Sequence, residues 1–234
     1  MAALAVRNLS KSYGGVRALA GVSFDVSAGE IVALIGPNGA GKTTCFNALN
    51  GQVAPDSGEV LLDGTSLVGR APHAIARLGV GRTFQVAATF GSMSVRENVQ
   101  TALQVNRRPP GDADAILERI GVAERADTPC AALAYGDLKR VELALVLAQR
   151  PRLLLMDEPT AGMAPEERDV LMKLAADLAR SESIAVLFTE HDMDVVFGFA
   201  QRVIALHLGE VIAEGSPEQV QANARLREVY LGDA

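Results

Sequence analysis

The sequence predicts an α/β fold built around a buried parallel sheet. Short, uninterrupted apolar runs at residues 31–35, 153–156 and 184–188 carry this prediction. Strands that are covered on both faces in a parallel sheet have such continuous apolar runs, whereas half-exposed strands alternate. Each run leads directly into glycine-rich or polar residues. Because ligands of open α/β sheets bind outside the carboxyl ends of the strands, we expect the functional site at these run ends.

An antiparallel layer is predicted near the N-terminus. Residues 4–9 and 21–26 alternate as strands, and residues 59–64 form a third strand that ends in a turn. Tyr13 lies in the turn between the first two strands. Its ring either packs under the hairpin or stacks on a flat ligand such as a purine, and most tyrosines are structural. The three strands bracket residues 36–44.

The first apolar run is followed by a phosphate-binding loop. Its sequence, Gly36-Pro37-Asn38-Gly39-Ala40-Gly41-Lys42-Thr43-Thr44, matches the pattern Gly-x-x-x-x-Gly-Lys-[Ser/Thr]. The glycines allow a tight turn whose backbone N–H groups point at an anion, and the helix expected from Thr43 adds the positive end of its dipole. Lys42 then contacts the phosphates and the Thr43 hydroxyl contacts Mg²⁺. The alternative is a glycine-rich turn with a stray lysine.

A mostly helical segment is predicted between residues 87 and 150. Ser94 and Glu97 have the spacing of a capping box, and another helix opens at residues 134–137. We interpret the segment as a helical subdomain inserted into the α/β core of a single domain. The boundaries are 87–150 for the helical subdomain and 1–86 with 151–234 for the core.

The second apolar run ends in two adjacent acids, Asp157 and Glu158. Buried strands rarely end in neighbouring carboxylates unless a cation or an anchoring role requires them. Beside a phosphate-binding loop, Asp157 is suited to hold Mg²⁺ and Glu158 to polarise an attacking water. The alternative is simple solvation of a strand end. Glu166, Glu167 and Asp169, in contrast, are predicted to form the solvated first turn of a helix, without chemistry.

The third apolar run leads to a histidine, His191. A single histidine after a strand is more often structural than catalytic. The carboxyl end of a parallel strand is nevertheless where ligands lie, so both interpretations of His191 stay open on this ground. His73 and His207 have no such context and are interpreted as surface residues.

Composition limits the classes of protein to which the chain can belong. It has 234 residues, of which 49% are hydrophobic and 4% aromatic, and no tryptophan, so the core must be aliphatic. The net charge of −6 argues against a general nucleic-acid binder, which needs basic residues to neutralise phosphates. We therefore expect no nucleic-acid partner.

Cysteines and apolar runs indicate the compartment. Cys45 and Cys130 show no metal-like spacing, and we interpret both as reduced structural thiols of a cytosolic protein. No apolar run approaches the roughly 18 residues of a transmembrane helix, and the N-terminus lacks the pattern of a signal peptide. If the protein works at a membrane, we expect a partner to recruit it.

Five motifs in order along the chain resemble those of the ATP-binding subunits of ABC transporters. They are the loop at residues 36–44, Gln85, Leu133-Ala134-Tyr135-Gly136, Met156-Asp157-Glu158-Pro159 and His191. The resemblance spans essentially the whole chain. It implies an ABC-type P-loop nucleotide-binding domain with an N-terminal antiparallel β-subdomain and an inserted helical subdomain.

Three further features are similar to the subunits that energise branched-chain amino-acid uptake in bacteria and archaea. They are the Leu-Ala-Tyr-Gly form of the signature, the run Thr-Glu-His-Asp-Met at residues 189–193, and the ending Tyr230-Leu231-Gly232. The resemblance therefore implies an importer for branched-chain or other hydrophobic amino acids.

The resemblance also implies how ATP is held. Tyr13 would stack on adenine, residues 36–44 would wrap the phosphates, and Lys42 would bind the β- and γ-phosphates. Two subunits would sandwich two ATP molecules. In that dimer, residues 133–137 would close over the nucleotide of the partner.

The resemblance assigns the chemistry to five residues. Thr43, Gln85 and Asp157 would hold Mg²⁺ directly or through water. Glu158 would act as the general base, and His191 would contact the γ-phosphate.

Three positions depart from the general pattern of the family. Ala134 stands where a serine usually presents its hydroxyl to the partner's γ-phosphate, so backbone N–H groups and the helix N-terminus near residue 136 must serve instead. Asp137 stands where an amide or glutamate is commoner. Ala164 replaces an aspartate in the loop that normally carries communication between the two ATP sites.

These features together predict an ATP-hydrolysing motor subunit of an importer, with ATP and Mg²⁺ as cofactors. The expected partners are a second ATP-binding subunit, identical or paralogous, the transmembrane permease subunits and, indirectly, a solute-binding protein. The expected location is the cytoplasmic face of the cell's inner membrane, as a peripheral subunit. An importer for a small polar solute such as urea or an amide is an alternative.

Two other functions are weighed against transport. An ATP-gated clamp in repair or translation usually carries two cassettes or long coiled-coil insertions, and this sequence has neither. An assembly module without turnover would require the loss of Lys42 or Glu158, and both are present.

A docking surface for a permease helix is predicted between residues 86 and 99. Phe90 and Met93 are large apolar residues in an otherwise small and polar segment, and anchors of this kind line helix-binding grooves. The alternative is that both side chains fill the core of the helical subdomain.

Overall fold

A mixed sheet of six strands forms the centre of the molecule, in the order β10-β9-β3-β8-β7-β6. The computed structural model describes residues 2–83, 88–223 and 226. The strands are β3 (Ile31–Ile35), β6 (Val80–Thr83), β7 (Leu153–Asp157), β8 (Ala185–Thr189), β9 (Arg202–His207) and β10 (Glu210–Gly215). Neighbours are parallel from β9 to β6, and β10 runs antiparallel to β9. The three apolar runs are β3, β7 and β8, so the predicted parallel sheet is confirmed.

A second sheet is antiparallel, in the order β2-β1-β4-β5. Its strands are β1 (Ala2–Tyr13), β2 (Val16–Ser27), β4 (Ser57–Leu62) and β5 (Thr65–Ser66). The predicted N-terminal β-layer is therefore confirmed, although β1 and β2 extend well beyond the alternating segments. Their pairing accommodates several register shifts, which break the strict alternation on which the prediction relied.

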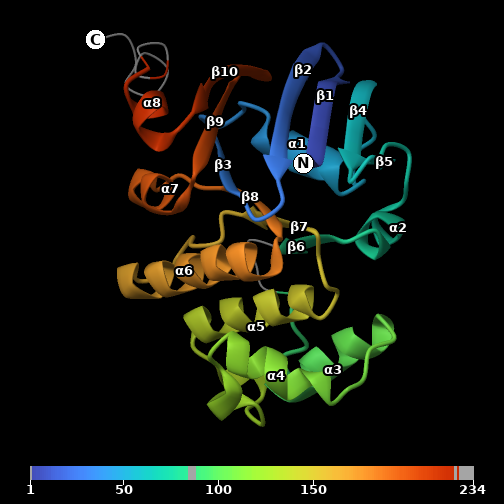
Figure 1. The fold of residues 1–234 in the computed structure, drawn as a ribbon, viewed down its shortest axis with the longest axis vertical. Helices are drawn as coiled ribbons and strands as arrows, with labels where there is room; N and C mark the ends of the chain where they lie inside the picture. Colours follow the sequence, from blue (N-terminus) through green and yellow to red (C-terminus); the bar gives the residue numbers. More distant parts are fainter. Residues whose placement is uncertain (1, 84–87, 224–225, 227–234) are drawn as a thin grey trace.

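Helices cover both faces and one end of the central sheet. They are α1 (Lys42–Leu49), α2 (Pro72–Arg77), α3 (Val95–Val105), α4 (Asp112–Arg119), α5 (Tyr135–Leu147), α6 (Pro165–Glu182), α7 (Met193–Phe199) and α8 (Pro217–Gln221), with short 3-10 turns at Ala123–Arg125 and Cys130–Ala132. In Figure 1, α3, α4 and α5 gather at one end of the molecule and the antiparallel sheet lies at the other. Within residues 2–83 and 88–223, no helix combines the length and hydrophobicity that a bilayer crossing demands.

The predicted helical segment begins later than its sequence suggested. Residues 88–94 form no helix, and α3 starts only at Val95 because Ser94 caps it, with Glu97 completing the predicted capping box. The division of the chain at residues 86 and 150 into core and helical subdomain stays a prediction.

The central strands feed two separate cores. Alternate side chains of β3 point to opposite faces: Ile31, Ala33 and Ile35 join the helices α3 to α7, whereas Val32 and Leu34 join α1 and the antiparallel sheet. All five side chains of β3 are buried. Both cysteines are free and buried, and burial raises the pKa of Cys45 to about 12, which fits an inert structural thiol.

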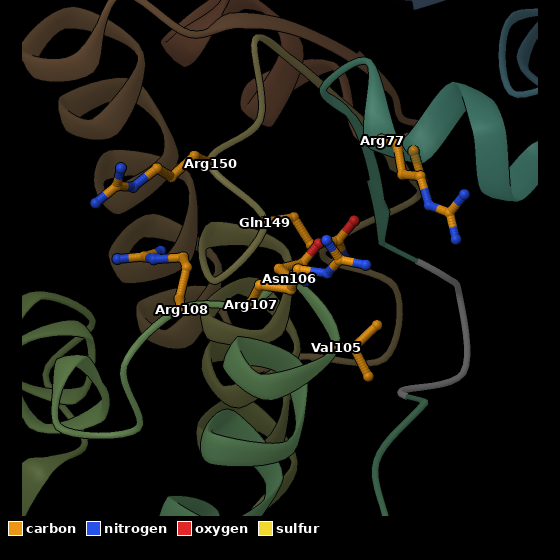
Figure 2. A pocket seen from close by; sticks show the side chains of 8 residues that line it. Arg77, Val105, Asn106, Arg107, Arg108, Gln149 and Arg150 are labelled. Atoms are coloured by element: carbon orange, nitrogen blue, oxygen red, sulfur yellow. The ribbon is translucent and has the colours of Figure 1, made fainter.

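A surface cavity of about 780 Å³ lies where α2, the end of α3 and the turn after α5 meet. Four arginines contribute to its lining: Arg77, Arg107, Arg108 and Arg150. Figure 2 shows Arg108 and Arg150 extending side by side, while Arg77 lies on the opposite side of the cavity. Arg108 pairs with Asp112 at 2.8 Å. Among the described residues, none of those that line this cavity is acidic.

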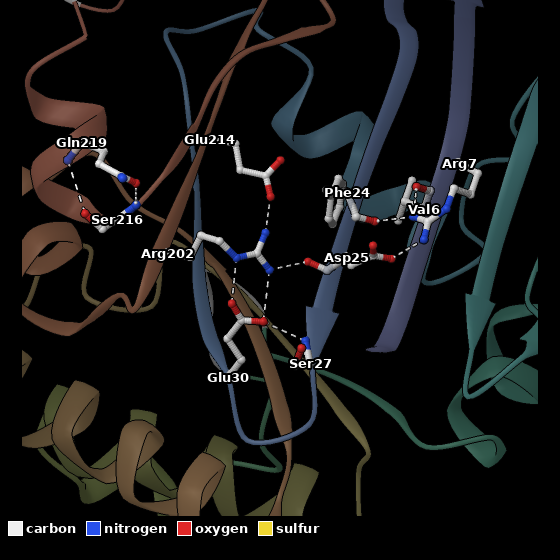
Figure 3. A network of polar contacts seen from close by, with 10 residues as sticks. All are labelled: Val6, Arg7, Phe24, Asp25, Ser27, Glu30, Arg202, Glu214, Ser216 and Gln219. Atoms are coloured by element: carbon white, nitrogen blue, oxygen red, sulfur yellow. Dashed lines mark hydrogen bonds and ion pairs between the residues drawn. The ribbon is translucent and has the colours of Figure 1, made fainter. Parts of the chain in front are cut away.

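Arg202 of β9 ties the two sheets together (Figure 3). Its guanidinium makes a bidentate pair with Glu30, at 2.7 and 3.0 Å, and donates to the Asp25 carbonyl of β2 at 2.6 Å. It also pairs with Glu214 of β10. Burial raises the pKa of the Glu30 carboxyl, but the bonds from Arg202 and the Ser27 N–H outweigh it and hold that pKa below its ordinary 4.5.

We predict that Glu30→Gln destabilises the fold by about 1–2 kcal/mol at neutral pH, since a charge-assisted bond is lost at a partly screened position. Because the pKa of Glu30 is lowered by folding, its contribution is present above pH 4.5 and disappears as the pH falls through the folded-state pKa. Urea unfolding at a series of pH values measures this difference. Asp177→Asn, which breaks an exposed pair with Arg180, is the control and should cost less than about 0.5 kcal/mol. A Glu30→Gln penalty that does not change with pH would contradict the assignment.

Candidate functional site

The loop residues 37–44, the two acids and His191 meet at a cavity of about 310 Å³ at the carboxyl ends of β3, β7 and β8. Its lining consists of Val16, Ala18, Pro37, Asn38, Gly39, Ala40, Gly41, Lys42, Thr43, Thr44, Asp157, Glu158 and His191. Four stretches that are separate in the sequence therefore converge on one cavity, and three of them were predicted. Val16 and Ala18 of β2 were not anticipated, because small apolar residues in a strand give no signal of a site.

Two glycines are required by the shape of the loop. A side chain at Gly36 would lie 2.3 Å from the Leu206 carbonyl oxygen, and one at Gly41 would lie 2.4 Å from the Ala18 carbonyl oxygen. Gly41 also has a φ of 106° and immediately precedes α1. The loop thus packs closely between β2 and β9, and the first N–H groups of α1 face the cavity without intrahelical acceptors.

The Lys42 side chain folds back over the phosphate-binding loop. Its Nζ donates to the carbonyl oxygens of Gly36 and Pro37, at 2.5 and 3.2 Å, and the residue is buried. Burial lowers the pKa of Lys42, whereas the charges of Glu158 and Asp157 act in the opposite direction. Burial has the larger effect, so the pKa of Lys42 lies below its ordinary value while two loop carbonyls hold Nζ in place.

Asp157 is held on both carboxylate oxygens. Oδ2 pairs with Arg82 Nη2 at 2.9 Å, and Oδ1 accepts from the Thr189 hydroxyl at 2.8 Å. Arg82 also donates to Asn47 of α1 at 2.8 Å and to Gln52 at 3.1 Å. The sequence analysis missed Arg82, because an arginine inside a short strand carries no motif. Its contacts connect the end of β6 to α1 and to the carboxyl end of β7.

Glu158 faces His191, with 3.0 Å between Oε1 and the histidine Nε2. Its backbone is left-handed, with a φ of 46°. The N–H of Glu158 donates to the carbonyl and the hydroxyl of Thr189, both at 3.1 Å. The His191 ring lies at the cavity and contacts an acid, which favours a functional role for this histidine over a purely structural one. His73 is exposed, His207 is half-buried, and neither lines the cavity.

The predicted residues outside this cavity lie in three places. Tyr13 ends β1 and is 48% exposed, with Lys11 Nζ 5.5 Å from the centre of its ring, and its stacking on adenine stays a prediction. Ala134 precedes α5, and Tyr135 and Gly136 are the first two residues of that helix. These two residues lie beside Gly162 and Glu167 and do not line the cavity. Gln85 lies outside the described residues.

The donors at the cavity fit a hard cation. The Thr43 hydroxyl and the Asp157 carboxylate offer oxygen atoms, which Mg²⁺ prefers. Within residues 2–83 and 88–223, no cluster of three or more histidine, cysteine, aspartate or glutamate side chains could hold a metal alone. One carboxylate and one hydroxyl beside a phosphate-binding loop fit Mg²⁺, which is usually bound by one or two carboxylates together with phosphates and waters.

These parts together suit the cleavage of a phosphoanhydride. Backbone donors and a lysine can hold phosphates on one side of the cavity, and an ionisable carboxylate stands on the other.

Comparison with known families gives two matches. A family model described as ABC transporter matches residues 19–161. A second, described as Branched-chain amino acid ATP-binding cassette transporter, matches residues 210–234.

Similar proteins cover nearly the whole chain. It is 38% identical to BraF of Pseudomonas aeruginosa, a high-affinity branched-chain amino acid transport ATP-binding protein, over 99% of this chain and 98% of that protein. LivG of Escherichia coli, which has the same description, matches with the same identity and coverage. The lipopolysaccharide export system ATP-binding protein LptB of Haemophilus influenzae is 35% identical over 100% of this chain and 98% of its own.

Solved structures agree. The ADP conformation of MJ1267, an ATP-binding cassette of an ABC transporter, has a TM-score of 0.90 at 28% identity over 100% of both chains. CbiO1 from Clostridium perfringens, part of the ABC transporter complex cbiONQ, has a TM-score of 0.87 at 32% identity over 98% of this chain and 96% of that one. A dimer of the cassette MJ0796 bound to ADP and Pi gives 0.80 at 26% identity, over 92% of this chain and 98% of that chain.

The first family model covers more than half of the chain, including the loop, Arg82 and both acids. The full-length relatives and the superposable cassettes extend the likeness to both ends. The chain therefore belongs to the ABC transporter family, as one of its ATP-binding and ATP-hydrolysing subunits.

Proposed function

We propose that this chain is the ATP-driven motor of an importer for branched-chain or other hydrophobic amino acids. The observation that carries the proposal is the meeting of Lys42, Asp157, Glu158 and His191 around one cavity behind a phosphate-binding loop. The names of BraF and LivG, and the family match at residues 210–234, support the amino-acid cargo. LptB is similar at 35% identity and serves lipopolysaccharide export, so overall identity alone does not select the cargo. An importer for urea or an amide is the alternative.

The loop and Lys42 bind the phosphates of ATP. Lys42 exchanges its bonds to the Gly36 and Pro37 carbonyls for phosphate oxygens, which are stronger acceptors because they are charged. Tyr13, which is half-exposed at the end of β1, provides a face on which adenine can stack.

Thr43 and Asp157 would hold Mg²⁺ directly or through water, as would Gln85, which lies outside the described residues. Mg²⁺, when bound, supplies positive charge that offsets the negative charge of the phosphates. Because Arg82 and Thr189 already engage both oxygens of Asp157, the carboxylate keeps a fixed orientation toward the cavity.

Glu158 accepts the proton of the attacking water. Its carboxylate lies at the cavity wall, and His191 Nε2 holds Oε1 in place at 3.0 Å. A carboxylate held in this way can act as a general base once the water lies between it and the terminal phosphate.

A second ATP-binding subunit closes over the nucleotide with its residues 133–137. In the single chain these residues do not reach the cavity, and Tyr135 is 40% exposed. Ala134 precedes α5, and the N-terminus of this helix offers the positive end of its dipole to a phosphate of the nucleotide that the partner holds. The dimeric MJ0796 cassettes, which superpose on this chain, support such an arrangement.

The permease subunits bind at the turn that carries Phe90. This side chain is 61% exposed, so it is not part of the core, whereas Met93 is half-buried. We place the subunit on the cytoplasmic face of the inner membrane, held there by this contact.

The Asn98 side chain holds the turn that carries Phe90 through contacts within the single chain. Its buried side-chain amide accepts from the Phe90 N–H at 2.8 Å and donates to the carbonyls of Phe90 and Ser94 at 3.0 and 2.9 Å. An anchor on a preorganised turn loses little entropy on binding.

We predict that Glu158→Gln lowers ATP hydrolysis by something like 10²- to 10⁴-fold, because the general base is lost while the phosphate contacts remain. Phosphate release assays measure the rate of hydrolysis. Calorimetry with ATP measures the Kd, which should stay within about threefold of the wild-type value, less than the tenfold change that corresponds to about 1.4 kcal/mol. Glu166→Gln, an exposed acid in the first turn of α6, is the matched control and should leave the rate unchanged. Hydrolysis by Glu158→Gln at the wild-type rate would show that the base lies elsewhere.

We also predict that Phe90→Ala combined with Met93→Ala blocks assembly with the permease subunits without loss of the fold. The melting temperature should fall by less than about 2 °C, because an exposed side chain contributes little to stability. Basal ATPase activity should stay near normal. Co-purification from detergent-solubilised membranes measures assembly, and Val170→Ala, another exposed apolar residue, is the control. A large drop in melting temperature with assembly intact would show that these side chains stabilise the fold and that the permease subunits bind elsewhere.

A further inference from the structure

The last residue of β8, Thr189, and the two residues that follow it contact the end of β7 and the loop after β7. Thr189 bonds to Asp157 and to the N–H of Glu158, and His191 contacts the Glu158 side chain. Between them, Glu190 accepts from both the N–H and the hydroxyl of Thr160, at 2.8 and 2.6 Å. Residues 189–191 thus form a template, in the sense that their contacts hold residues 157–160 in position.

Glu190 is an unusual member of this template because it is a buried acid. It is only 4% exposed, and its other oxygen accepts from the His191 N–H at 3.2 Å. Within residues 2–83 and 88–223, no lysine, arginine or histidine forms an ion pair with it. A buried carboxylate without a cation is costly, so its hydrogen bonds must be well formed for it to be tolerated.

The loop that Glu190 holds is under backbone strain. Glu158 has a φ of 46°, in the left-handed region that costs a non-glycine residue about 1 kcal/mol or more. Such a conformation persists only where its surroundings fix it. Thr189 fixes the chain at the Glu158 N–H, and Glu190 fixes it again two residues later at Thr160. Without the second contact, the segment from Glu158 to Thr160 would be free to relax.

We propose that Glu190 is a positioning residue: its clamp on Thr160 keeps the strained Glu158 aimed at the cavity and opposite His191. The inference rests on the proposed role of Glu158 as the base. Glu190 itself does not line the cavity, so it acts through the loop and touches neither phosphate nor water.

The clamp and the nucleotide-binding loop are separate parts, which makes the inference testable. Removing Glu190 should lower kcat by about 10-fold or more, because a displacement near 1 Å at a reacting group can cost about 100-fold. The affinity for ADP, measured by calorimetry without turnover, should change by less than about twofold, because Lys42 and residues 36–44 are untouched. A general loosening of the fold would instead reduce both.

The experiment compares Glu190→Ala, Thr160→Val and the double variant, with Thr160→Ser as the control that keeps the hydroxyl. Thr160→Val keeps the shape and removes only the bond at 2.6 Å. We expect both single variants to lower kcat, the double variant to be no worse than Glu190→Ala, and Thr160→Ser to stay within about twofold of wild type, as expected for residues that act as a unit. Thr160→Val tests the clamp even if Glu190→Ala fails to fold.

Combination with Glu158→Gln separates this inference from the proposed function. If Glu190 acts by positioning Glu158, Glu190→Ala should cause no further loss in the Glu158→Gln background. An additional loss of the same size in that background, or an unchanged kcat in both Glu190→Ala and Thr160→Val, would overturn the clamp while leaving the base assigned. A wild-type rate for Glu158→Gln alone would overturn the assignment of the base, and the clamp with it.

Discussion

The burial of the parallel strands on both faces is the constraint on which the site depends. Every side chain of β3 and β8 is buried, and alternate residues enter two different cores. A register shift of one residue would exchange the two sets, so the strands are fixed along their length. Their carboxyl ends are fixed as well, and the loop after β3, the acids at the end of β7 and His191 after β8 meet at one cavity.

Several residues of the site are in energetically unfavourable environments or conformations, which the rest of the fold must stabilise. Lys42 and Glu190 are buried, Asp157 ends a buried strand and Glu158 has a left-handed backbone. Loop carbonyls hold Lys42 and Thr160 holds Glu190, whereas the ends of β6 and β8 hold Asp157 and Glu158. The cross-sheet contacts of Arg202 act at a distance from the cavity and hold β2 and β9, the two strands that pack against the loop. Local strain at the site is thus carried by a rigid surrounding structure.

Sequence patterns predicted the features that have a strong local signal. The apolar runs gave β3, β7 and β8, and the capping box placed the start of α3. They missed α2, whose N-cap is Ala71 without a side-chain bond, and β6, which is four residues long and contains a glycine and an arginine. Arg82, Thr189 and Glu190 were missed as site residues for a different reason. Their roles arise from contacts across strands that lie 30 or more residues apart in the sequence, and no local pattern records such contacts.

The central claim is that ATP binds at the carboxyl ends of β3, β7 and β8, and the most direct test is to locate the bound nucleotide. Hydrogen exchange of Glu158→Gln, with and without ATP and Mg²⁺, reports which backbone amides the ligand protects. Slower exchange of the amides of residues 38–44, with little change at the arginine-lined cavity of residues 105–108 and 149–150, is the predicted result. Protection at the arginine-lined cavity without protection of residues 38–44 would contradict the placement of the nucleotide at the ends of β3, β7 and β8.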